Sequence, residues 1–195
     1  MIVKARLGDV ARILKGTQPT NTVDKPSGPR FFGVAEISAD GGGPVRYTAK
    51  DADLARAVLL QDGDVAIALL GGRGHVALVG SGQAGAVLGR ECAVLRVVDS
   101  NRLVPAWLYA WVTSQEFRTA ALATARGATM PRLNVRALEE LEVALPSREA
   151  QQETAALIAR FDSAISATLS ALTELKDLRR IEIDIAVAEV TDRQP

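Results

Sequence analysis

The chain has 195 residues, 48% of them hydrophobic, which is enough for one full domain with an appendage or for two small domains. Its 23 basic and 23 acidic residues give a net charge of zero, so the total charge indicates neither a strongly basic nor a strongly acidic protein. Cys92 is the only cysteine and His75 the only histidine, which excludes an intrachain disulfide and a metal site built from several cysteines or histidines.

No stretch of the sequence has the pattern of a membrane or secretion segment. The longest uninterrupted apolar runs, such as residues 65–70, are far shorter than the roughly 20 residues that cross a bilayer. The start, MIVKARLGDV, lacks the order of cationic, apolar and small residues typical of a signal peptide. We therefore expect a soluble, cytoplasmic protein without a membrane partner.

The N-terminal part of the sequence predicts one short helix and two loops. Residues 5–16, ARLGDVARILKG, are typical of a short helix that ends at Gly16. Residues 17–31 and 38–52 hold most of the proline, glycine, threonine and aspartate of this part, so we expect loops there.

Three short apolar runs between glycine-rich breaks predict buried β-strands: GDVAIALLG (63–71), HVALVG (75–80) and CAVLRVV (92–98). The turn between the first two runs contains Gly71, Gly72 and Gly74, which allow positive φ angles and a close approach of the backbone to a ligand. We expect an antiparallel hairpin with Arg73 and His75 at its tip. The apolar neighbours of Cys92 indicate a buried, inert thiol, and a nucleophile pair of Cys92 with His75 has no activating context.

A G-x-G-x-x-G motif occurs at Gly80, Gly82 and Gly85. A dinucleotide site needs a helix directly after these glycines, within a βαβ unit. Only six residues, AVLGRE, separate Gly85 from the next predicted strand, which is too short for a crossover helix. No lysine follows the glycines as a phosphate-binding loop would require, so we expect no cofactor.

The rest of the first 148 residues predicts helices and one more strand. Residues 103–127 are typical of one helix that ends at Gly127, and residues 134–145 of a short helix beginning at Asn134, followed by a strand over 141–145. Strands and helices therefore mix in an α+β domain, with a small mixed or antiparallel sheet and flanking helices.

One long helix is predicted from Glu149 onward, because no glycine occurs there and no proline before Pro195. Pro146 and Ser147, the latter a candidate N-cap, precede it. Six residues at helical spacing form one apolar stripe: Ile158, Phe161, Ile165, Leu169, Leu172 and Leu175. About 40 residues give a helix of about 60 Å, so the stripe needs a partner, either another helix of the same kind or another protein.

The two parts of the chain differ in charge. Residues 1–148 hold 18 basic and 14 acidic residues, whereas residues 149–195 hold 5 and 9. This asymmetry suits a first part that approaches a polyanion, although ordinary surface charge fits it equally well.

Three separated blocks, in this order, resemble half of a type I restriction-modification specificity subunit. They are RLGDVARILKGTQP, GDVAIALLGGRGHVALVG and the segment from LVPAWLYAW to LPSREAQQ. The resemblance implies a target-recognition domain over residues 1–148, a coiled-coil-like spacer and dimerisation helix over 149–190 and a tail over 191–195. Full-length members carry two such domains and two helices in one chain.

By this resemblance the chain recognises a DNA sequence for a separate adenine methyltransferase subunit, with a motor nuclease subunit joining in restriction complexes, and catalyses nothing itself. The long helix pairs antiparallel with a second copy through the apolar stripe, so that the homodimer reads an inverted repeat in double-stranded DNA with an unread spacer.

The candidate DNA contacts lie in the polar and glycine-containing turns, where arginine and lysine can bond guanine and phosphate and where threonine and glutamine can read base edges. They are Lys15, Thr17, Gln18, Arg30, Arg46, Lys50, Arg73, Gly74, His75, Arg126, Thr129 and Arg132. Three alternatives remain open: a recognition module of another DNA modification or defence complex, a nucleotide-binding enzyme using the motif at 80–85, and a structural adaptor that acts through its helix.

Overall fold

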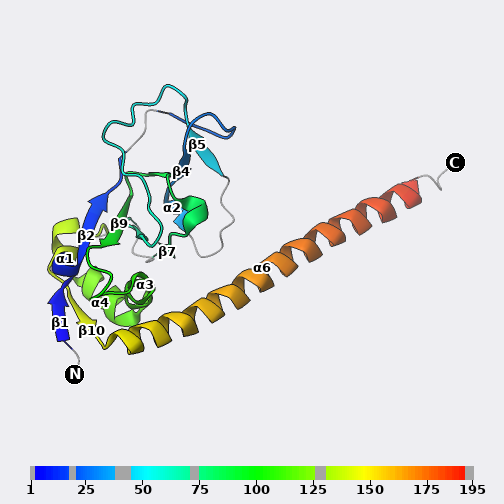
Figure 1. Cartoon of the computed structure of the whole chain (residues 1–195). Coiled ribbons are helices and arrows are strands. Elements are labelled where there is room, and N and C mark those ends of the chain that lie inside the picture. Colours follow the sequence, from blue (N-terminus) through cyan, green and yellow to red (C-terminus); the bar gives the residue numbers. More distant parts are fainter. Residues whose placement is uncertain (1–2, 18–20, 38–44, 71–74, 126–130, 192–195) are drawn as a thin grey trace. The chain divides into compact units, whose positions relative to one another are not determined.

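The computed structural model describes residues 3–17, 21–37, 45–70, 75–125 and 131–191, with side chains as far as residue 188. The chain forms two compact units, residues 1–155 and 156–195, which are described separately below. The first unit is α+β, as the sequence predicts, and the second is a continuation of one long helix (Figure 1).

A four-stranded antiparallel sheet forms the centre of the first unit. Its strands lie in the order β2 (Ala11–Lys15), β9 (Cys92–Val97), β6 (Val65–Ala68) and β7 (Val76–Leu78). Successive side chains of a strand point to opposite faces of the sheet, so Val65 and Ile67 enter one core and Ala66 the other. Burial on both faces explains why β6 and β9 are continuous apolar runs rather than alternating ones.

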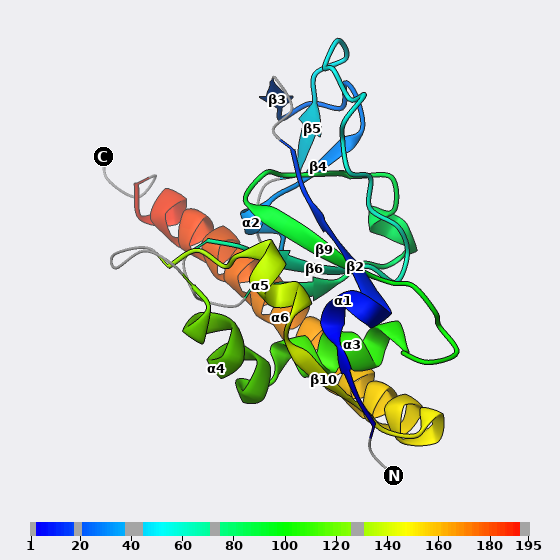
Figure 2. The same cartoon turned by 90° about the vertical axis from the view of Figure 1, so that its left-hand side faces the viewer.

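Helices and a two-stranded sheet cover the first face of the central sheet (Figure 2). The helices are α1 (Leu7–Val10), α3 (Pro105–Thr113), α4 (Gln115–Ala123) and α5 (Val135–Glu139). The two strands are β1 (Val3–Arg6) and β10 (Glu142–Leu145), which pair antiparallel. Leu108, Trp111 and Phe117 are among the largest side chains that α3 and α4 bury in this core, with the Trp111 and Phe117 rings packed edge to face.

A second small sheet contributes to the core on the other face. Its order is β3 (Thr22–Val23), β5 (Arg46–Thr48), β4 (Arg30–Phe32) and β8 (Val87–Leu88), in which only β4 and β8 are parallel. Phe32, Leu88 and Ile37 of the short helix α2 (Val34–Ile37) pack there against Val94 of β9. Figures 1 and 2 both show β4 and β5 at the end of this unit opposite β1 and β10.

Two loop predictions are therefore wrong in part, because residues 17–31 and 38–52 contain β3, β4 and β5. These strands have two or three residues each, too few to give a periodic pattern, and partners distant in the sequence stabilise them. The helix predicted over residues 5–16 is also wrong: only Leu7–Val10 make a helical turn, and Ala11–Lys15 pair with β9 along their whole length.

The helix predicted over residues 103–127 is two helices, because the chain turns at Ser114. Ser114 ends α3 in an extended conformation, and its Oγ accepts a hydrogen bond from Phe117 N at 3.2 Å, which caps α4. Gly127, the predicted end of this helix, lies outside the described residues.

Other predictions are confirmed. The three apolar runs form β6, β7 and β9, and β6 and β7 pair antiparallel as a hairpin does. Asn134 caps α5 by accepting a hydrogen bond from Arg136 N at 3.0 Å, and β10 follows within one residue of the predicted strand.

The long helix α6 (Arg148–Thr191) has 44 residues, which correspond to about 66 Å. Ser147 is its N-cap, as predicted, since Ser147 Oγ accepts a hydrogen bond from Ala150 N at 3.3 Å. A hydrogen bond from its own backbone N–H and, to a smaller extent, one from the Ser147 hydroxyl lower the pKa of Glu149 in the first turn, because both stabilise its carboxylate.

Gln151 in the first turns of α6 is a buried polar residue, only 2% exposed. Its Oε1 accepts a hydrogen bond from Val104 N at 2.8 Å, while its Nε2 donates to the carbonyls of Arg102 and Pro146 at 3.1 and 3.0 Å. Gln151 therefore joins the start of α6 to the segment that precedes α3, within the first unit.

Within the second unit, most of the large apolar side chains of α6 are exposed, and Ile158 and Leu169 of the predicted stripe are partly exposed. Phe161, Ile165, Leu172 and Leu175 of the predicted stripe are 45–62% exposed. By length and composition, α6 is the one helix among the described residues that could cross a membrane, because its mean hydropathy reaches 1.3 over 18 residues. The short apolar runs of the sequence did not indicate such a helix. One such helix is weak evidence for a membrane span, since an apolar helix that packs on a protein partner meets the same criterion.

Replacing Gln151 by Ala should destabilise the first unit by about 1–3 kcal/mol, because Val104 N and two carbonyls lose their buried partner. Urea unfolding of Gln151→Ala measures this, and Gln152→Ala, which removes an exposed neighbour of the same type, is the matched control. Equal midpoints for the two variants would contradict the anchoring role of Gln151.

Candidate functional site

Three segments distant in the sequence meet at the end of strand β6. Leu69 N donates to Glu91 O at 2.8 Å, and Leu133 N donates to Leu69 O at 2.9 Å. Leu70 also forms a β-bridge with Arg132. Residue 70 immediately precedes the glycine-rich segment 71–74, and Arg132 follows segment 126–130 closely. The structure thus places the flanks of two predicted contact segments side by side.

A charged cluster lies at this junction. Glu91 accepts a hydrogen bond from Arg132 on Oε2 and forms an ion pair with Arg90, whose Nε lies 3.2 Å from Oε1. The side chains are 28% exposed for Glu91, 42% for Arg132 and 64% for Arg90, so all three reach the surface. Of these three residues, the sequence predicted only Arg132 as a candidate contact, since a Gly-Arg-Glu sequence ahead of a strand carries no motif of its own.

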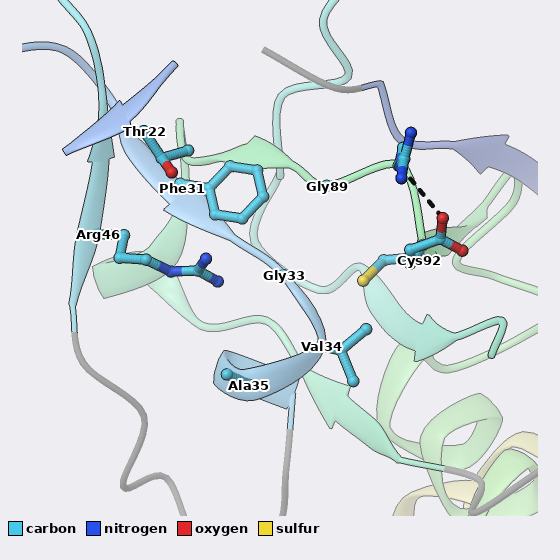
Figure 3. A pocket seen from close by; sticks show the side chains of 10 residues that line it. Thr22, Phe31, Gly33, Val34, Ala35, Arg46, Gly89 and Cys92 are labelled. Atoms are coloured by element: carbon cyan, nitrogen blue, oxygen red, sulfur yellow. Dashed lines mark ion pairs between the residues drawn. The ribbon is translucent and has the colours of Figure 1, made fainter. Parts of the chain in front are cut away.

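A pocket of about 240 Å³ opens beside this cluster (Figure 3). It lies between the second small sheet and the start of β9, with Phe31 and Arg46 on one side and Cys92 on the other. The lining residues are Thr22, Phe31, Gly33, Val34, Ala35, Arg46, Gly89, Arg90, Glu91 and Cys92. The pocket therefore combines an apolar floor with two arginines and a carboxylate.

Arg46, a candidate contact from the sequence, is held by neighbouring side chains. Its Nε and one terminal nitrogen donate to the Glu36 carboxylate at 3.2 and 3.3 Å, and its guanidinium stacks 4.9 Å from the centre of the Phe31 ring. Glu36 Oε2 also accepts from Gly33 N at 2.8 Å. These contacts fix the orientation of the Arg46 guanidinium in the pocket wall.

Two glycines near the pocket permit close packing of the backbone. A Cβ on Gly16 would lie 2.1 Å from Gly89 O, and a Cβ on Gly89 would lie 2.7 Å from Phe31 Cζ. Gly16 N in turn donates to Cys92 O at 2.9 Å. The prediction that Gly16 ends a helix is therefore wrong. Gly16 instead lets the chain that follows β2 pass close to the backbone of Gly89.

Cys92 is buried at the base of the pocket. Burial, with a smaller contribution from the Glu36 charge, raises the pKa of its thiol to about 12. At neutral pH the thiol therefore stays protonated, as expected for an inert cysteine, and Cys92 cannot act as a nucleophile there.

The remaining candidate contacts are distributed over several elements. Lys15 ends β2, and Thr17 N donates to Leu88 O at 3.2 Å in the next turn. Arg30 of β4 donates to Gly82 O at 3.3 Å, Lys50 lies in an exposed turn, and His75 O accepts from Ala68 N at 3.0 Å. Gln18, Arg73, Gly74, Arg126 and Thr129 lie outside the described residues.

The G-x-G-x-x-G segment does not have the geometry of a dinucleotide site. After β7 the chain makes one 3-10 turn, Ser81–Gln83, and then enters β8 without a crossover helix. Added Cβ atoms at Gly82 and Gly85 would meet nothing within 4 Å, so neither glycine is needed for a close approach. Within the described residues, no group of three or more histidine, cysteine or acidic side chains could hold a metal ion.

A buried ion pair supports the central sheet rather than the site. Asp64, which is buried, accepts two hydrogen bonds from Arg96 at 2.8 Å each and one from Gln61 N at 2.9 Å. The Asp64 carboxylate raises the pKa of the Arg96 guanidinium further above its ordinary value. This bidentate pair joins the start of β6 to β9.

Comparisons with known proteins agree with the fold. The model of the family "Type I restriction modification DNA specificity domain" matches residues 2–176. No curated protein matches the chain significantly.

Solved structures match over most of the chain. The type I restriction-modification S subunit of M. genitalium gives a TM-score of 0.68 at 19% sequence identity, over 92% of this chain. The HsdS subunit of Thermoanaerobacter tengcongensis gives a TM-score of 0.59 at 22% sequence identity, over 95% of this chain. A chain from a structure described as the basis of complex assembly and conformational transition of the type I R-M system gives 0.63 at 22% over 93%. The chain spans 43–44% of the length of these proteins.

Proposed function

Because the chain belongs to the type I restriction-modification DNA specificity family, we propose that it recognises a DNA sequence on behalf of a separate adenine methyltransferase subunit. A motor nuclease subunit joins the same complex when restriction takes place, and this chain supplies no catalytic group. The observation that carries the proposal is the meeting of the residues that flank two candidate contact segments, at Leu69–Leu70, beside Arg132 and Arg90.

The DNA contacts are made by the charged and polar residues around that junction. Arg132 and Arg90 present guanidinium groups near the surface, where they reach guanine edges or phosphates. Arg73, Gly74, His75, Arg126 and Thr129 belong to the same region by sequence. Lys15, Thr17, Gln18, Arg30 and Lys50 serve as outer contacts, and Arg46 acts from the pocket wall.

The helix α6 pairs antiparallel with a second copy, and the exposure of its apolar stripe supports this proposal. At 100° per residue, Ile183 continues the face of Ile165 and Leu172, whereas Leu178, Ile181 and Ile185 lie on roughly the opposite face. All six side chains are 45–57% exposed. One face serves the second copy and the other offers an apolar surface to the methyltransferase subunit.

In this arrangement residues 1–148 act as the recognition domain, 149–190 as the spacer helix and 191–195 as a tail. Two identical recognition domains related by a two-fold axis read an inverted repeat with an unread spacer. The complex works in the cytoplasm, where the DNA is.

Replacing Arg132 or Arg73 by Ala should weaken binding to the selected DNA sequence by about 1–3 kcal/mol each, because each removes a guanidinium contact to a base or a phosphate. The target is first selected from a random duplex library with the wild-type protein, and the equilibrium Kd of each variant is then measured at fixed salt. Arg6→Ala is the control, since Arg6 lies on β1 and pairs with the exposed Glu140. Affinities equal to that of Arg6→Ala would count against these contacts.

A charge in the apolar stripe should abolish the homodimer. Ile165→Asp places a carboxylate on the proposed helix interface, whereas Ser163→Asp places it on roughly the opposite face of the same turn. Sedimentation equilibrium should give a monomer for Ile165→Asp and a dimer for both the wild type and Ser163→Asp. A wild-type monomer at micromolar concentration, or a dimeric Ile165→Asp variant, would refute this pairing.

A further inference from the structure

We propose that Glu91 is a specificity-determining positioning residue, which holds Arg132 in the orientation that discriminates between DNA sequences and lowers the non-specific attraction of the site for phosphates. This inference rests on the proposed DNA-binding function and adds to it a residue that the sequence did not single out. It is carried by the geometry of Glu91, Arg132 and Arg90 at the end of β6.

Both partners of the pair have fixed backbones. The carbonyl of Glu91 accepts from Leu69 N at 2.8 Å, and Arg132 bridges to Leu70 while the next residue, Leu133, donates to Leu69 O at 2.9 Å. Leu69 itself is buried in the core. The Glu91 carboxylate and the Arg132 guanidinium therefore meet across a segment that cannot shift without disturbing the core, and the rotamer of Arg132 is set before DNA arrives.

A carboxylate at a DNA interface lowers the affinity for DNA, so the presence of Glu91 there calls for a role that offsets this loss. A negative charge near phosphates opposes binding, and Glu91 is only 28% exposed, so its charge is partly desolvated. Its two oxygens are both occupied by arginines, one each from Arg132 and Arg90. The cluster of three therefore carries a net charge of only +1, with the Arg132 guanidinium aligned by one of these bonds.

Removing the charge of Glu91 has two effects, one on discrimination between sequences and one on non-specific affinity. Arg132 gains rotational freedom, so it contacts any nearby phosphate as readily as its own base edge, and discrimination falls. The cluster then carries +2, so non-specific affinity rises and becomes more dependent on salt. Loss of a merely structural ion pair would instead weaken binding to all sequences or leave it unchanged.

The test compares Glu91→Gln, which keeps the size of the side chain, with Glu140→Gln, which removes a similar exposed ion pair with Arg6 on β1. Full-length protein is titrated with the duplex that the wild type selects and with a scrambled duplex of the same composition, at several salt concentrations. For Glu91→Gln we expect the target-to-scrambled ratio of affinities to fall about tenfold, with tighter binding to the scrambled duplex and a salt dependence steeper by about one phosphate contact. Glu140→Gln should match the wild type.

Two further variants test the role of Arg132. Arg132→Lys keeps the positive charge but loses the planar guanidinium, so the target-to-scrambled ratio of affinities should fall while the salt dependence stays unchanged. This result tests the role of Arg132 even if Glu91→Gln does not fold. In the Glu91→Gln and Arg132→Ala double variant, the ratio should equal that of Arg132→Ala alone.

Three results would overturn the proposal: an unchanged ratio in Glu91→Gln, weaker binding to both duplexes in that variant, or additive losses in the double variant. A wild-type protein that prefers no duplex would instead contradict the proposed DNA-reading function, and the inference about Glu91 with it. The failure of Glu91 alone is therefore distinguishable from the failure of the function.

Discussion

The two backbone hydrogen bonds of Leu69 determine where the surface chemistry of this protein lies. Leu69 follows β6 directly, its side chain is buried in the core, and its N–H and C=O bond to Glu91 and Leu133 on either side. A central sheet that is buried on both faces thus ends in a short three-segment ladder at the surface. The position of Arg132, Glu91 and Arg90 follows from that ladder, so the rigidity of the core is transmitted to the residues that meet DNA in the proposed function.

The elements that the sequence predicts correctly are those whose signal is local. Apolar runs predicted β6 and β9. Asn134 and Ser147 predicted the starts of two helices, and the absence of glycine predicted α6. The short strands β3, β4 and β5 could not be predicted, because two or three residues show no periodic pattern and become a strand only through pairing with residues far along the chain. The break between α3 and α4 was not predicted, because the helical pattern continues across Ser114 and gives no sign that Ser114 caps a new helix.

The candidate site shows the same division. The sequence put forward Arg132 and the flanks of the glycine-rich segment as candidate contacts, since turns with glycine and arginine are recognisable. It did not put forward Glu91, whose place beside Arg132 depends on which segments meet. Gly16 and Gly89 are needed for close packing, because a Cβ at either would collide with the facing strand or ring. At the glycines of the 80–85 motif, which the sequence already excluded as a dinucleotide site, an added Cβ would meet open space or a nearby side chain.

The central claim is that this chain directs a methyltransferase to a particular DNA sequence, and one measurement tests it directly. Methylated motifs are mapped across the genome of the host with and without the gene for this chain. The account predicts that one class of methylated adenine disappears with the gene, and that its motif is an inverted repeat interrupted by an unread spacer. An unchanged set of methylated motifs would contradict the claim, and a lost motif without dyad symmetry would contradict the pairing of two identical copies.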